Sequence, residues 1–144
     1  MTAEEVRTSL KQRFPMIMID CVVSLEEGKS IRAIKNVSTN DVYSLSRSTG
    51  YVGLPGTMII EAIGQAASIL FAKSTGMGIR PAEFAVLGAI NEIQFLKPVV
   101  PGDRMEIGVY VSKFVGTHAV VKTVVTVDQT EVAKGSLGFA VRTL

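Results

Sequence analysis

The pattern of apolar and polar positions predicts two strands, one long helix and four further strands, in that order. Runs rich in Val, Ile and Met at Met16–Leu25 and Ser30–Val37 flank the turn Glu26-Glu27-Gly28-Lys29, which is typical of a β-hairpin. A polar loop at Ser38–Gly53 then leads into a helix that continues to about Lys73. Four Val-rich strand candidates follow, separated by Pro, Gly and Asp residues that favour compact turns; they are Phe84–Phe95, Arg104–Phe114, Thr117–Val127 and Glu131–Val141.

A short helix is expected at the N-terminus. Thr2 and Glu5 have the spacing of a capping box, in which each side chain accepts a hydrogen bond from the backbone of the other residue. Proline disfavours the helical conformation of the residue before it, so Phe14-Pro15 limits how far this helix can run. We expect the helix to end before Phe14 and to lie at the periphery.

The long helix is apolar on nearly every side, which indicates that it lies inside the protein. It opens with the turn Leu54-Pro55-Gly56. One such helix among six antiparallel strands is buried most simply by a strongly curved sheet wrapped around it. This predicts an α+β fold with a single domain over residues 1–144. One sheet leaves apolar surface beside the helix and unpaired strand edges, so we expect a dimer or larger assembly formed through a continued sheet.

Glu61 and Gln65 are the polar exceptions on this helix. An ionisable carboxylate in apolar surroundings is costly unless it is paired, hydrogen-bonded or lining a cavity. The two residues are four positions apart and share one helix face, where the Gln65 amide can orient the Glu61 carboxylate. Glu61 is therefore the leading site residue and Gln65 its support. The alternative is a structural Glu61, tied to a basic residue or to backbone amides.

Composition removes several classes of protein. The 144 residues are 47% hydrophobic and 19% charged, which is ample for a core, and the net charge of +2 comes from scattered Lys and Arg that form no nucleic-acid-binding stripe. The one cysteine, Cys21, excludes an intramolecular disulfide, and no Cys/His spacing suits zinc, so we expect a cytoplasmic protein without a metal. Residues 1–13 lack the apolar core of a signal peptide, and the apolar run Met58–Ala72 is too short to span a membrane.

Four stretches, taken in order, resemble the FabZ-type β-hydroxyacyl-acyl-carrier-protein dehydratases over nearly the whole chain. They are Arg13–Asp20, Gly28–Val37, the helix start Leu54–Ala67 and the Lys-Pro-Val-Val-Pro-Gly-Asp segment Lys97–Asp103. The resemblance implies the hotdog fold and dehydration of (3R)-hydroxyacyl chains in fatty-acid, polyene or polyketide synthesis. It also implies that an acyl carrier protein presents the substrate on its phosphopantetheine and that no other cofactor is used.

The same resemblance implies two residue roles. Glu61 matches the helix carboxylate that handles the departing hydroxyl, and the backbone amide of Gly56 matches the donor that polarises the thioester carbonyl. Elementary electrostatics supports the second role, because a free amide at a helix N-terminus points at developing negative charge, as an enolate-like transition state requires.

The chain departs from the family at the catalytic base. The family carries a His-Phe-Pro-Gly motif whose histidine removes the α-proton. This histidine lies 14 residues before the helix carboxylate. In this chain the position 14 residues before Glu61 is Arg47, and only Gly50 of the motif remains. Arginine is never a free base at working pH. The one histidine, His118, is expected at the start of a late strand, away from the base loop. In a homodimer Arg47 would face the partner's carboxylate at position 61 and favour its ionised form, or it points to solvent from a remodelled loop.

Three functions therefore remain open. The first is a dehydratase subunit that donates Glu61 and Gly56 to a site shared with a histidine-bearing hotdog partner, as a heterodimer. The second is a hotdog acyl-thioesterase that uses Glu61 as base or nucleophile. The third is a non-catalytic acyl or carrier-protein binding module. For docking an acidic carrier protein, the basic candidates by position are Arg47, Lys97 and Arg104.

Overall fold

The computed structural model of the chain describes residues 1–41, 53–74 and 83–143. Its elements follow the order expected from the sequence, with the long helix between the second and third strands. Their bounds are α1 Ala3–Ser9, β1 Cys21–Glu26, β2 Ser30–Asn36, α2 Gly56–Ala72, β3 Glu83–Phe95, β4 Arg104–Val115, β5 His118–Val127 and β6 Thr130–Thr143.

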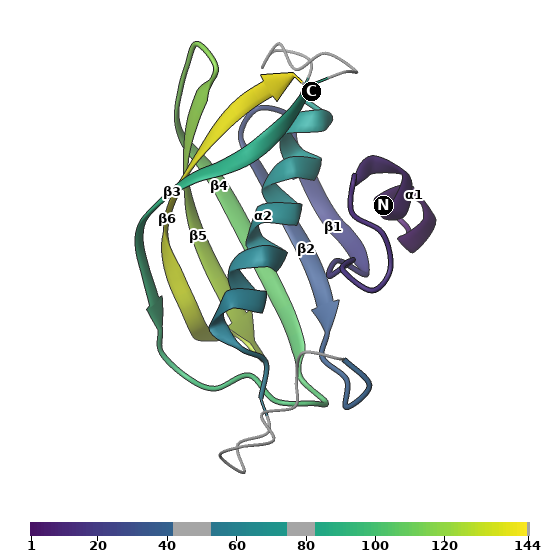
Figure 1. The fold of residues 1–144 in the computed structure, drawn as a ribbon. Coiled ribbons are helices and arrows are strands. Elements are labelled where there is room, and N and C mark those ends of the chain that lie inside the picture. Colours follow the sequence, from purple (N-terminus) through teal and green to yellow (C-terminus); the bar gives the residue numbers. More distant parts are fainter. Residues whose placement is uncertain (42–52, 75–82, 144) are drawn as a thin grey trace.

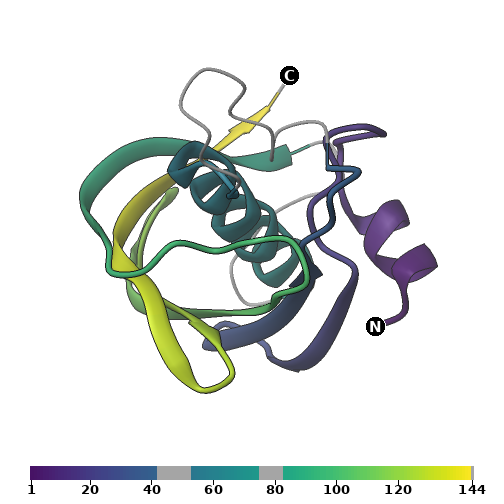
Figure 2. The same ribbon diagram turned by 90° about the horizontal axis from the view of Figure 1, so that it is seen from below.

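The strands form one six-stranded sheet in the order β1-β2-β4-β5-β6-β3, and every neighbouring pair is antiparallel. The sheet curves around α2, while α1 lies outside, beside β1 (Figure 1). The view along the helix shows how far the sheet encloses it (Figure 2). This is the hotdog arrangement predicted for the chain. Strands β1 and β3 are the two edges, and each pairs on one side alone within the described chain.

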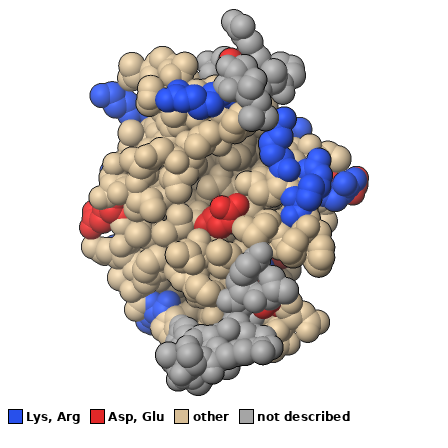
Figure 3. Space-filling model, viewed as in Figure 1, with Lys and Arg blue, Asp and Glu red and all other residues tan. Residues whose placement is uncertain are grey.

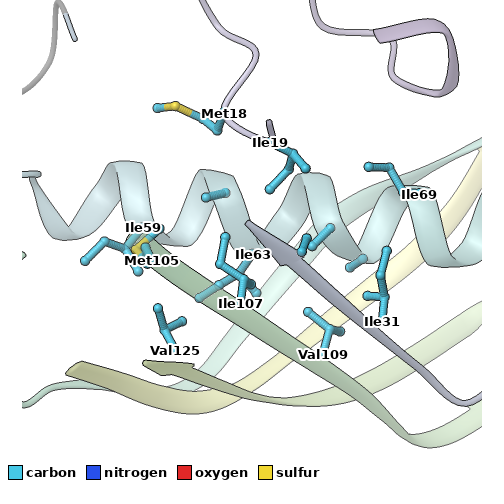
Figure 4. Close-up of a cluster of buried hydrophobic side chains, with 14 of the residues drawn as sticks. Met18, Ile19, Ile31, Ile59, Ile63, Ile69, Met105, Ile107, Val109 and Val125 are labelled. Atoms are coloured by element: carbon cyan, nitrogen blue, oxygen red, sulfur yellow. The ribbon is translucent and has the colours of Figure 1, made fainter. Parts of the chain in front are cut away.

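The core lies between the inner face of α2 and the concave face of the sheet. Ile59, Ile63 and Ile69 of the helix are at most 3% exposed, and the first two lie on the side of the helix that faces the buried residues of β4 (Figure 4). In Figure 4, Ile59 lies beside Met105 near the start of β4, and Val109 lies farther along this strand, below the later turns of α2. The apolar spacing of the helix therefore matches the inward positions of the sheet, as burial of apolar surface requires.

Both ends of α2 are tied to loops of the sheet. Before the helix, the Leu54 N–H donates to the Val99 carbonyl over 2.8 Å. After it, the Ser74 hydroxyl donates to the Leu70 carbonyl over 2.6 Å and accepts from the Gly28 N–H over 2.7 Å. Gly28 sits in the β1–β2 turn with a φ of 69°, a conformation that favours glycine. The helix is thereby fixed along its own axis relative to the sheet.

The first half of the chain matches the sequence prediction at α1 but not at the start of β1. The capping box of Thr2 and Glu5 is present, and α1 ends at Ser9, well before Phe14. The strand expected from Met16 begins at Cys21 instead. The cause is that the backbone of Met16 and Met18 bonds to the side chain of Gln65 on α2 rather than to a neighbouring strand. Most of the loop Ser38–Gly53 lies outside the described residues.

The long helix is less enclosed than its sequence suggested. It is buried on its sheet side, but Glu61, Gly64 and Ser68 on the opposite side are half-buried and Thr57 is exposed. Within the described ranges, no helix is long and apolar enough to cross a membrane.

Candidate functional site

Glu61 is the only charged residue of α2, and it lies on the half-open face of the helix. Its Oε1 atom accepts two side-chain hydrogen bonds, from Gln65 Nε2 at 2.8 Å and from Gln12 Nε2 at 3.3 Å. In the described part of the chain, neither a basic side chain nor a backbone amide contacts this carboxylate, and its Oε2 accepts no hydrogen bond. One carboxylate oxygen is thus held while the other is left available.

Gln65 is fully buried, and its amide makes three hydrogen bonds. Its Oε1 accepts from the Met18 N–H at 2.8 Å, while its Nε2 donates to the Met16 carbonyl at 2.7 Å and to Glu61. An amide with all of these partners has one orientation only, with its N–H towards the carboxylate. The four-residue spacing therefore does bring Gln65 onto Glu61, and the rest of the amide joins α2 to the segment before β1.

The first turn of α2 provides hydrogen-bond donors. Pro55 is the N-cap residue and supplies no side-chain cap, so the Gly56 N–H donates to no described group. The ring of Phe95 packs on this turn: a Cβ on Gly56 would stand 2.6 Å from its Cζ atom. Glycine permits that close approach, and a larger residue here would require the Phe95 ring to shift. By the helical rise, the Gly56 amide and Glu61 lie about 7.5 Å apart along the axis.

Sequence reasoning missed Gln12. It lies between α1 and β1, immediately before the Arg13-Phe14-Pro15 stretch that carries part of the family resemblance, and that position was the only signal for it. Gln12 also lines a cleft of about 510 Å³ whose walls are residues 8–13, the last turns of α2 and the start of β3. Glu61 does not line this cleft, so Gln12 is the link between the two.

The other sequence candidates are not brought to Glu61. His118 begins β5 at an exposed position, where its Nδ1 lies 3.3 Å from the Thr117 hydroxyl, and the β4–β5 hairpin is at the opposite end of the sheet from the first turn of α2 (Figure 1). Lys97 is exposed after β3. Arg104 is exposed beside Arg32 and Glu106 and lines a hollow on the outer face of the sheet. Arg47 lies outside the described residues.

The charge around the site is uneven. Figure 3 shows a small acidic surface at the centre of the face that carries α2, surrounded by uncharged residues; Lys and Arg lie nearer the edges of this face, among them a group on the side of α1. The basic residues of the cleft wall there are Lys11, Arg13 and Lys73. The described residues hold no cluster of His, Cys, Asp and Glu that could bind a metal. The geometry thus offers a fixed carboxylate and a backbone amide donor, a pair suited to acid–base chemistry beside a carbonyl.

Comparison with known proteins identifies the family of the chain. A family model described as a FabA-like domain matches residues 10–136. The 3-hydroxyacyl-[acyl-carrier-protein] dehydratase FabZ of Salmonella arizonae is 43% identical over 102 residues, which cover 71% of this chain and 67% of that protein. The FabZ of Salmonella newport matches over the same length with the same identity.

Solved structures share the fold at low identity. The dehydratase heterocomplex ApeI:P from Xenorhabdus doucetiae has a TM-score of 0.79 at 14% identity, covering 94% of this chain and 89% of that one. The fluoroacetyl-CoA thioesterase FlK has a TM-score of 0.70 at 14% identity, covering 84% and 90%. The fold alone therefore does not select an activity. The match over residues 10–136 and the 43% identity to FabZ do select a family: this chain belongs to the FabA-like family, as a FabZ-type member with the hotdog fold.

Proposed function

We propose that the chain is a (3R)-hydroxyacyl-acyl-carrier-protein dehydratase subunit that works in fatty-acid or related acyl-chain synthesis. The observation that carries the proposal is the Glu61 carboxylate, held on Oε1 and available on Oε2, beside an uncapped helix N-terminus. In the proposed elimination, Glu61 protonates the departing hydroxyl. The Gly56 N–H donates to the thioester oxygen, where negative charge develops as the α-proton leaves.

The base for the α-proton is proposed to come from a second, histidine-bearing hotdog chain. This chain has one histidine, and it begins β5 at the opposite end of the sheet from the first turn of α2 (Figure 1). The open edge strand β3 supports such a partner, because Leu87, Ile90 and Phe95 on it are between 37% and 49% exposed, which is unusual for large apolar side chains on an edge strand. One structural neighbour is itself described as a dehydratase heterocomplex.

The substrate is proposed to arrive on the phosphopantetheine of an acyl carrier protein, and no further cofactor is proposed. We propose that this acidic protein docks on exposed basic residues. Lys97 and Arg104 are candidates on the described surface, and Arg47, which lies outside the described residues, is a third. This proposal concerns the partner surface only and does not affect the chemistry of Glu61.

The test uses a FabZ-type partner whose own helix carboxylate has been replaced by Gln, so that it can supply histidine but no acid. Mixed with this chain, it should dehydrate a 3-hydroxyacyl-carrier-protein substrate, whereas each chain alone should be inactive. Glu61→Ala should lower the rate of the mixed pair at least about 100-fold, the lower range for loss of a positioned acid. Glu131→Ala, an exposed carboxylate at the start of β6, is the matched control and should keep the rate.

A co-purifying mixed pair without dehydration would contradict the proposal, and so would an active lone chain.

A second function, acyl-thioester hydrolysis, is favoured by the same carboxylate, because its available Oε2 atom suits a base or nucleophile and no imidazole is required. Release of free thiol from acyl-CoA or acyl-carrier substrates by the lone chain, lost in Glu61→Ala, would favour it. Binding of an acyl-pantetheine without any turnover would instead indicate a non-catalytic binding module.

A further inference from the structure

We infer that Gln12 is a positioning residue: its side-chain amide, together with that of Gln65, holds the Glu61 carboxylate in one orientation and leaves Oε2 as its reactive oxygen. The inference rests on the proposed role of Glu61 and adds a second support that comes from outside the helix. The two Nε2–Oε1 distances are 3.3 Å for Gln12 and 2.8 Å for Gln65.

A single donor does not fix a glutamate carboxylate. The torsion that rotates the carboxylate plane has a broad energy profile, so one hydrogen bond on one oxygen leaves the plane free to turn. Gln65 lies on the same helix, one turn after Glu61, whereas Gln12 comes from the separate segment between α1 and β1. Two donors from two elements restrict both the position of Oε1 and the direction of Oε2.

The backbone that carries Gln12 is itself held. Leu10 beside it is 3% exposed, and its N–H donates to the Val6 carbonyl of α1. The Arg13 guanidinium nitrogen Nη1 donates to the Leu10 carbonyl at 2.7 Å and to the Gln12 carbonyl at 2.8 Å. The Arg13 carbonyl in turn accepts from the Met16 N–H at 2.8 Å. Gln12 therefore projects from an anchored segment, unlike a surface glutamine on a free loop.

The amide of Gln12 has capacity beyond this bond. Both N–H donors of Gln65 are used, but within the described chain Gln12 makes the bond to Glu61 and no other side-chain hydrogen bond. Gln12 also lines the 510 Å³ cleft, so a molecule that enters the cleft meets the group that contacts Glu61. A bond of 3.3 Å in the free protein is of the length that tightens when substrate fills a site.

The test measures the NMR resonance of the Glu61 carboxylate and requires no turnover. The chain is labelled with ¹³C at glutamate Cδ, and the Glu61 resonance is assigned from its loss in Glu61→Gln. Gln12→Met keeps the length of the side chain and removes the donor, so it should move the Glu61 resonance. Gln94→Met is the matched control, because the Gln94 amide donates to Glu92 at 2.9 Å; it should move the Glu92 resonance and leave Glu61 in place. Conversely, Glu61→Gln should shift the side-chain amide resonances of Gln12.

Turnover by the mixed pair gives the second readout. Gln12→Met should lower kcat about 3- to 10-fold with KM within about twofold of the parent, because the lost bond orients the acid and does not bind the substrate. A Glu61 resonance that Gln12→Met leaves unmoved overturns the inference, whatever the activity. A moved resonance with an unchanged kcat also overturns it. If the unmodified pair is inactive, the proposed function fails, and the resonance still decides whether Gln12 holds Glu61.

Discussion

The two faces of α2, a helix of 17 residues, differ in burial and in polarity. The inner face is apolar and buried against the concave side of the sheet. The outer face carries Glu61, Gly64 and Ser68 at half-buried positions, and its one charge is held by amides. The inner face therefore contributes free energy of folding, and the outer face carries the proposed catalytic carboxylate. Substitutions on the two faces should separate stability from activity.

The largest loss of stability is expected on the inner face. Ile63→Ala removes a fully buried side chain and leaves a cavity, which should lower the free energy of unfolding by roughly 2–5 kcal/mol. Chemical denaturation of the purified chain measures this. Ile60→Ala is the matched control: the same change three residues earlier, at a half-buried position, should cost clearly less. Equal losses would mean that the outer face is covered in solution, which would break the contrast between the faces.

Gln65 bonds to Glu61 and also joins α2 to the segment before β1, so its substitution should affect both activity and stability. Gln65→Leu leaves the Met18 N–H and the Met16 carbonyl without partners, which should lower the free energy of unfolding by about 2–3 kcal/mol. It should also lower turnover by the mixed pair, because Glu61 loses its shorter hydrogen bond. Denaturation and dehydration rates are measured on the same preparation. A variant with full activity and reduced stability would show that Gln65 supports the fold alone.

The smallest change is expected at the start of the helix. Gly56→Ala brings a Cβ against the Phe95 ring and should cost about 1–2 kcal/mol of stability, since crowding of this kind forces the ring to move. In the double variant with Phe95→Leu the cost should be largely recovered, because a smaller side chain leaves room. Melting temperatures of the two single variants and the double variant measure this coupling. Additive losses would show that the two residues do not meet in solution.

The sequence predicted what depends on local spacing. The Pro55-Gly56 turn located the start of α2, Thr2 and Glu5 located the start of α1, and the Gln65 amide was expected beside Glu61. The sequence did not predict contacts between distant segments. Nothing in the Met16–Asp20 stretch shows that its backbone bonds to a helix side chain, so the strand was expected too early. Gln12 was missed for the same reason, because it is 49 residues from its partner.

The strand order of the sheet is also set by contacts between distant segments, which the sequence pattern did not predict. Alternating apolar patterns predicted six antiparallel strands, but they do not say that β3 pairs with β6 alone and forms an edge. The exposed apolar side chains of β3 become informative only once that edge is known. A surface for a partner is thus a property of the assembled sheet rather than of the β3 sequence.

Both amide donors approach the same oxygen of Glu61, and this has a stereochemical consequence. A carboxylate free to rotate is symmetric and could serve a hydroxyl on either side of an acyl chain. Here the pair of amides makes its two oxygens inequivalent, so a single oxygen faces the incoming group from one direction. In a dehydratase built this way, the direction from which the acid meets the hydroxyl would be set by the hydrogen bonds of that acid as well as by the shape of the substrate site.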